Sequence, residues 1–176
     1  MSEIPEPVDQ ALARHDAFTA TESGYTLDTT VFEAVVTASS AEGKRDGEFA
    51  VTVRLPTLDA AVTGETVHEV VEDGWFETLE LRLEDTFDVA TTSTHDPPQV
   101  TRTDDEVVVE LSYIAWNASE GVEDAKTLVE FVEGTYAQGI VPGYEYRGAA
   151  AELMQSAVQN SENAVDGGGS SGGPPL

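Results

Sequence analysis

His68 is the residue of this 176-residue chain that most resembles a metal ligand. It lies in the run Glu65-Thr66-Val67-His68-Glu69-Val70-Val71-Glu72. On a helix, His68 would share a face with Glu72, and Glu65 and Glu69 would lie close to it. Such spacing can hold a divalent cation. A zinc site needs three protein ligands, however, and no second histidine motif joins these residues. We therefore predict no metal site.

The other two histidines give no catalytic motif. His95 and Asp96 could complete a Ser–His–Asp triad with one of the serines. The sequence has no nucleophile elbow and no glycine-rich oxyanion loop beside a serine, which disfavours that assignment. His15 lies on the apolar side of a predicted helix, where a position at the edge of the core or on the surface is favoured. The catalytic residues, if there are any, stay unassigned.

Carboxylates are too frequent to identify a site by themselves. Acid–base catalysis needs one carboxyl group in an apolar pocket that raises its pKa. Glu110 lies inside an apolar run and is the one acid whose pattern suggests partial burial, with a solvent-facing position as the favoured alternative. The chain has no cysteine, which excludes thiolate nucleophiles and cysteine-based metal sites. Its glycines form neither a GxGxxG motif nor a P-loop, and we predict no cofactor.

The charge balance is the strongest compositional signal. There are 34 acidic and 8 basic residues, for a formal net charge of -26. Such a surface repels itself at ordinary ionic strength. At molar salt the Debye length falls to roughly 3 Å and the repulsion is screened. Because the acids are spread along the whole chain, we predict a salt-adapted protein. The charge argues against nucleic-acid binding, which needs Lys and Arg against phosphate.

The cellular compartment can be predicted from two absences. The first ten residues, MSEIPEPVDQ, are acidic and contain no apolar stretch typical of a signal peptide. No apolar run approaches the roughly 20 residues of a membrane span. We therefore expect a cytoplasmic protein that does not bind membranes.

Periodicity predicts an α+β fold with helices packed on an antiparallel sheet. The predicted order is α-β-β-β-α-β-β-α plus a C-terminal helix. Predicted helices cover residues 8–18, 63–85 with an interruption at Gly74, 122–136 with Ser119 as the N-cap, and 149–160. Predicted extended segments cover residues 25–27, 31–39, 49–55, 87–94, 100–103 and 106–116, with turns at 41–47 and 95–98. Residues 79–84 also fit a strand. The run 106–116 is apolar on both faces, which predicts a central strand covered on two sides.

The chain length predicts one domain, residues 1–160. Residues 161–176 end in DGGGSSGGPPL. Gly, Ser and Pro at this density cannot bury enough surface to become ordered, so we predict a disordered tail.

Two segments are similar to members of an uncharacterised domain family of haloarchaea. They are Gly74-Trp75-Phe76-Glu77-Thr78 and the stretch from Val132-Glu133-Gly134-Thr135-Tyr136 to Gly139-Ile140-Val141-Pro142-Gly143-Tyr144-Glu145-Tyr146. The resemblance extends over most of the chain except the tail and implies no activity, because the family has no known function. The order of elements also resembles that of type III secretion chaperone-like domains, which is a likeness of fold only.

The lack of catalytic motifs favours a non-enzymatic protein-interaction or adaptor domain. The aromatic residues beside glycine breakpoints are the interaction candidates, because large aromatics bury much area in a partner. These candidates are Trp75, Phe76, Tyr144 and Tyr146. The competing interpretation is that all four complete the core. The alternative function is an enzyme or small-ligand binder with a site of scattered His and carboxylate residues. The partner and the oligomeric state are not predicted.

Overall fold

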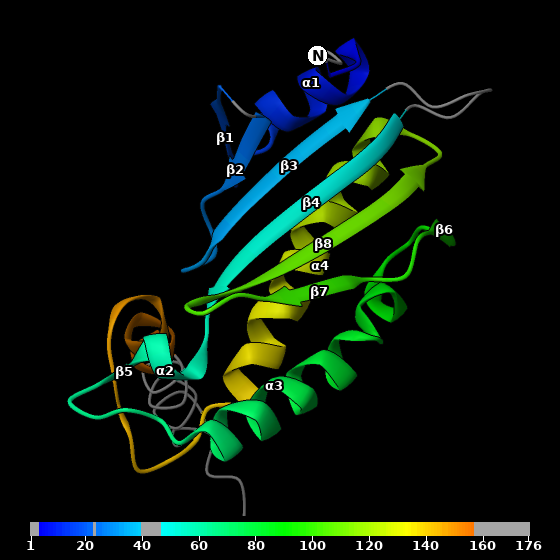
Figure 1. Ribbon diagram of the computed structural model, residues 1–176. Coiled ribbons are helices and arrows are strands. Elements are labelled where there is room, and N and C mark those ends of the chain that lie inside the picture. The colour runs from blue at the N-terminus through cyan, green and yellow to red at the C-terminus, as the bar shows by residue number, and fades with distance from the viewer. Residues whose placement is uncertain (1–3, 23, 40–46, 157–176) are drawn as a thin grey trace, which may run out of the picture.

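The computed structural model describes residues 4–22, 24–39 and 47–156 and contains a seven-stranded antiparallel sheet (Figure 1). The main path runs β1 (Phe18–Thr21), β2 (Gly24–Leu27), β3 (Glu33–Ser39), β4 (Gly47–Pro56), β8 (Glu106–Ala115) and β6 (Thr94–His95). A seventh strand, β7 (Gln99–Arg102), also pairs with β8. The predicted α+β class is confirmed.

The helices form a second layer. They are α1 (Glu6–Arg14), α2 (Leu58–Ala61), α3 (Glu69–Leu83), the 3₁₀ helix η1 (Thr86–Val89) and α4 (Ala118–Gln138). Residues 148–156 are also helical. In Figure 1, α4 crosses behind β4 and β8, while α1, α3 and η1 pack on α4. A short ladder outside the main sheet joins β5 (Val62–Thr63) to β9 (Glu145–Tyr146). In the part of the chain that the structure describes, no helix combines the length and apolarity needed to cross a bilayer.

The core lies between the sheet and α4. Side chains alternate between the two faces of a strand. On β4 the buried positions are Phe49, Val51, Val53 and Leu55. The matching positions of α4 are Val122, Ala125, Leu128, Val129 and Val132. We call the sheet face that meets α4 the inner face and the opposite face the outer face. No helix of the described residues covers the outer face.

The prediction that residues 106–116 are covered on two sides is wrong. β8 is central, but its residues alternate between buried and partly exposed positions. Glu110 is exposed on the outer face, as the favoured alternative predicted. The strand reads as continuously apolar because Val108 and Ile114 also point outward, where neighbouring strands half-bury them.

The predicted start of the second long helix is also wrong. Thr63 pairs with Glu145 in the β5–β9 ladder. Gly64 has φ +85°, which does not belong to a right-handed helix. The helix instead begins at Glu69, continues through Gly74 without interruption, and confirms the helical interpretation of residues 79–84.

Three smaller predictions are corrected. Residues 86–89 form a 3₁₀ helix where an extended segment was predicted. The N-cap of α4 is Asn117 rather than Ser119, because its side-chain oxygen accepts from the Glu120 N–H at 2.8 Å. The first helix ends at Arg14, and Phe18 begins β1. Residues 41–46 of the predicted turn, residues 157–160 of the predicted last helix and the predicted tail 161–176 lie outside the described residues.

Gly121 fixes where α4 crosses the sheet. A Cβ atom at Gly121 would lie 2.3 Å from Cε1 of Phe49 and 2.9 Å from Cβ of Ala115. The Phe49 ring is fully buried and stacks on Tyr113, with centroids 5.2 Å apart and planes 5° apart. The Tyr113 hydroxyl in turn donates to the Gly121 carbonyl at 2.6 Å. Only a glycine lets the helix backbone approach the sheet this closely.

Two glycines of α4 should therefore respond oppositely to alanine. Gly121→Ala should destabilise the fold by about 1–3 kcal/mol, because the clash with Phe49 outweighs the gain in helix propensity. Gly134→Ala, where an added Cβ meets nothing within 4 Å, should stabilise it by about 0.5–1 kcal/mol. Chemical denaturation in molar KCl measures both. A stabilised Gly121→Ala would show that α4 is not held by this contact.

Candidate functional site

His68 caps a helix and does not stand on one. Its Nδ1 atom accepts the Val70 N–H at 3.2 Å, and His68 is the N-cap of α3. The helical spacing that brought His68, Glu69 and Glu72 to one face is therefore not formed. Among the described residues, no group of three or more potential ligands is placed to hold a metal ion.

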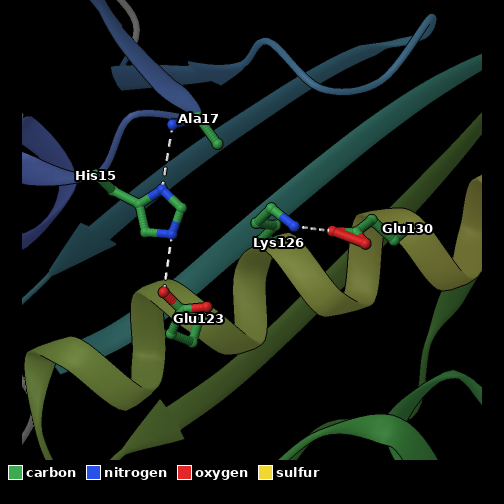
Figure 2. A network of polar contacts seen from close by, with 5 residues as sticks. All are labelled: His15, Ala17, Glu123, Lys126 and Glu130. Carbon is green, nitrogen blue, oxygen red and sulfur yellow. Dashed lines mark hydrogen bonds and ion pairs between the residues drawn. The ribbon is translucent and has the colours of Figure 1, made fainter.

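His15 connects α1 to α4 (Figure 2). Its Nδ1 accepts the Ala17 N–H at 3.2 Å, and its Nε2 lies 2.8 Å from Oε1 of Glu123. Because Nδ1 is an acceptor, the ring proton sits on Nε2 and points at the carboxylate. Lys126, one turn further along α4, pairs with Glu130. These contacts give His15 a structural role at the edge of the core.

His95 and Ser112 face opposite sides of the sheet. His95 pairs with Tyr113, and its ring stacks on Phe87 with centroids 3.9 Å apart. Ser112 pairs with Ala50, so its hydroxyl points to the outer face. Nδ1 of His95 lies 3.0 Å from the Asp96 carbonyl oxygen, not from the Asp96 carboxylate. This geometry does not build a Ser–His–Asp triad.

Glu72 is a half-buried acid that the sequence did not single out. Its Oε2 is buried without a hydrogen-bond partner, and its Oε1 lies 3.5 Å from the Asp59 N–H. Burial raises the pKa of Glu72, and the Asp59 N–H, the Arg102 charge and the Thr57 hydroxyl oppose that rise in part. No local pattern marks this burial, because the groups that act on the carboxyl, Asp59, Thr57 and Arg102, lie elsewhere in the chain. The carboxyl group ties α3 to α2.

Asp124, the most buried acid of α4, has both of its carboxylate oxygens engaged in hydrogen bonds within the fold. Its two carboxylate oxygens accept the Thr91 N–H at 2.8 Å and the Thr92 N–H at 2.9 Å. It thereby holds the segment between η1 and β6 against α4. Asp124 also helps to raise the pKa of Tyr113, for which burial is the larger cause.

The four predicted interaction residues lie partly or wholly in the core. Trp75 is 7% exposed and meets Tyr136 edge-on, so it does not fit an exposed anchor. Phe76 is half-buried under the Arg102 guanidinium, 4.6 Å from the ring centroid. The Tyr146 hydroxyl donates to the Val141 carbonyl at 2.6 Å, and Tyr144 is half-buried. For Phe76, Tyr144 and Tyr146 a part in binding stays a prediction.

The outer face of the sheet carries an ordered array of side chains. The register of β3, β4 and β8 sets these side chains in rows across the strands. We number the rows one to four from the β4 C-terminal end. Row one is Glu33, Arg54 and Val108; row two is Val35, Thr52 and Glu110; row three is Thr37, Ala50 and Ser112; row four is Ser39, Glu48 and Ile114.

Row three is the low point of this face. Its side chains are small and uncharged, and a hollow of about 440 Å³ lies over them. The hollow is lined by Thr37, Ala38, Ser39, Glu48, Phe49, Ala50 and Ser112. A smaller hollow of about 100 Å³ adjoins it toward β6 and shares Glu48 and Ser112. The outer face is therefore hollowed over row three and the adjoining Ser39 and Glu48 of row four, and we call this hollow the trough.

Of two charged residues on the outer face, Arg54 has an ion-pair partner and Glu48 has none among the described residues. Arg54 donates from Nη1 to Oε2 of Glu106 at 3.0 Å and lies beside Glu33. Glu48 is exposed, and no ion pair joins it to another described residue.

The alternation of residues 49–55 was the sequence signal for a strand with one buried face. The rows of the outer face depend in addition on the register between strands, which alternation alone does not predict.

Comparison with known proteins gives one match. The model of a family described as "Family of unknown function (DUF5813)" matches residues 13–156. Neither the curated proteins nor the solved structures contain a match.

Glu72 should make stability depend on pH. Because its folded pKa is raised above 4.5, protonated Glu72 favours the fold at low pH, and that contribution is lost as pH rises through the folded pKa. Glu72→Gln should therefore melt higher than wild type at pH 7, and the difference should shrink as pH falls below 4.5. Melting curves in molar KCl test this, with the exposed Glu77→Gln as control. A Glu72→Gln variant that melts lower at pH 7 would contradict it.

Proposed function

This chain belongs to a family of unknown function, DUF5813, and we propose that it is a non-enzymatic protein-interaction domain that binds through the outer face of its sheet. The observation that carries the proposal is the trough over row three. A large antiparallel sheet with helices on one side leaves a broad, rigid surface on the other. Rigid surfaces of this kind bind proteins without a costly loss of conformational freedom.

The composition of the outer face supports an interface. Its aliphatic members are Val35, Val108 and Ile114, and they stand among hydroxyl-bearing side chains. Row three has no charge in a chain with 34 acidic residues. Interface cores are depleted in charged residues, while hydroxyl groups at their margins can satisfy hydrogen bonds from a partner.

The side chains that could take part in catalysis already make contacts within the fold, which supports the non-enzymatic part of the proposal. His15, His68 and His95 each have structural contacts, and Asp124 holds a backbone segment. An enzyme or small-ligand site would need several of these groups to converge on one cavity. The smaller hollow is open, and although His95, Asp96 and Ser112 all line it, His95 and Ser112 belong to opposite faces of the sheet.

We also propose a haloarchaeal, cytoplasmic setting for this domain. The formal charge of -26 favours a protein that works in molar salt, where carboxylate repulsion is screened. The order of elements that the sequence predicts resembles that of type III secretion chaperone-like domains. That likeness supports protein binding by analogy of fold alone.

Affinity capture from a salt-matched haloarchaeal lysate tests the proposal. Thr37→Arg and Ser112→Arg each place a long charged side chain in row three and should lose the proteins that wild type captures. Thr78→Arg makes the same change in size and charge on an exposed part of α3 and should keep them. Circular dichroism checks that every variant is folded.

Two results would count against this surface. Capture that is unchanged in both row-three variants would exclude the outer face as the interface. Loss of capture in Tyr144→Ala, with both row-three variants still active, would move the interface to the loop that carries Tyr144.

A further inference from the structure

We propose that the outer face binds a second copy of the same chain, face to face about a two-fold axis. This inference rests on the proposed function and names its partner. Most soluble oligomers are symmetric homo-oligomers, and a two-fold interface requires a surface that is complementary to itself. The rows of the outer face have that property.

The symmetry operation is simple to state. A two-fold axis runs parallel to the rows, midway between row two and row three, in the plane between two facing sheets. It lays each strand over its own counterpart in the reverse direction. Row one of one copy then faces row four of the other, and row two faces row three. Sheets packed face to face lie about 10 Å apart with interdigitating side chains, and their strand directions stay within about 30° of each other.

Two charges of the outer face, those of Arg54 and Glu48, complement one another under this operation, whereas Glu110 faces a serine. On β4, Arg54 of row one faces Glu48 of the second copy, and the reciprocal pair forms on the other side of the axis. Arg54 has five N–H donors and uses one of them in the bond to Glu106. Glu48 has no ion pair of its own among the described residues. Covering Glu48 with a neutral surface would leave a buried charge unpaired, which is costly.

The remaining contacts match in kind and size. On β8, Val108 faces Ile114 of the second copy, and Glu110 faces the Ser112 hydroxyl. On β4, Thr52 faces Ala50 of the second copy. The larger side chains of row two of each copy therefore enter the trough over row three of the other copy.

The size of the face predicts a weak dimer. From Glu48 to Arg54 the strand extends about 20 Å, and the five strands from β2 to β7 span about 20 Å. This footprint is smaller than that of a standard interface, which buries about 800 Å² per partner. Each copy also carries a formal charge of -26, so association needs molar salt to screen the repulsion. We expect dissociation constants in the micromolar range or weaker.

A charge exchange tests the proposal. Sedimentation equilibrium of the full chain in molar KCl, from low to high micromolar concentration, should show a monomer–dimer equilibrium. Glu48→Arg and Arg54→Glu should each weaken it about tenfold or more, because each sets like charges opposite one another. The double variant Glu48→Arg with Arg54→Glu exchanges the partners and should restore the dimer.

Matched controls separate the interface from other effects. Glu80→Arg makes the same charge change as Glu48→Arg on an exposed part of α3 and should leave the dimer unchanged. Glu106→Gln removes the ion pair of Arg54 within one chain and should also leave the dimer intact. Ser112→Arg fills the trough and should abolish association, which provides a second test if Arg54→Glu does not fold.

Three outcomes would overturn the inference. They are a wild-type chain that stays monomeric at every concentration, a double variant that folds but does not restore the dimer, and a Ser112→Arg variant that dimerises normally. If the wild type is monomeric while row-three variants still lose a captured protein, the proposal of a second copy as partner is wrong, but the proposed protein-interaction function is kept. If capture is also unchanged, both proposals fail.

Discussion

The close contact of Gly121 with the ring of Phe49 determines the rest of the architecture. The helix can lie this near the sheet only where a side chain is missing, and the stacked rings of Phe49 and Tyr113 fill the space beneath it. The Tyr113 hydroxyl closes the contact on the Gly121 carbonyl. With α4 seated there, α1 and α3 pack on its flanks, and the inner face is closed. The outer face is left open.

An open sheet face is a physical problem that the chain must solve. Half of the side chains on β3, β4 and β8 point away from the helices, and several of them are aliphatic. Hydroxyl groups on the same face keep it compatible with water, while the small side chains of row three leave it hollow. A second copy would close that hollow and supply a guanidinium to Glu48, which has no ion pair with any residue that the structure describes.

Sequence patterns predicted the elements that have strong local signals. The alternation of Phe49, Val51 and Val53 gave β4 and its buried face. The start of α3 was mispredicted because the β5–β9 ladder that displaces it pairs residues far apart in the chain. Gly74 did not end the helix, since the flanking Trp75 and Leu79 side chains are anchored in the core. The rows of the outer face were not predictable, because they depend on the register of three strands brought together by tertiary folding.

The reactivity of a single thiol in row three is the most direct test of whether a second copy covers the outer face. The chain has no cysteine, so Ser112→Cys introduces the only thiol, and Thr78→Cys on α3 provides the matched exposed reference. We expect the rate of maleimide labelling at position 112 to fall as the chain concentration rises in molar KCl, while the rate at position 78 stays constant. Equal, concentration-independent rates at both positions would contradict the account.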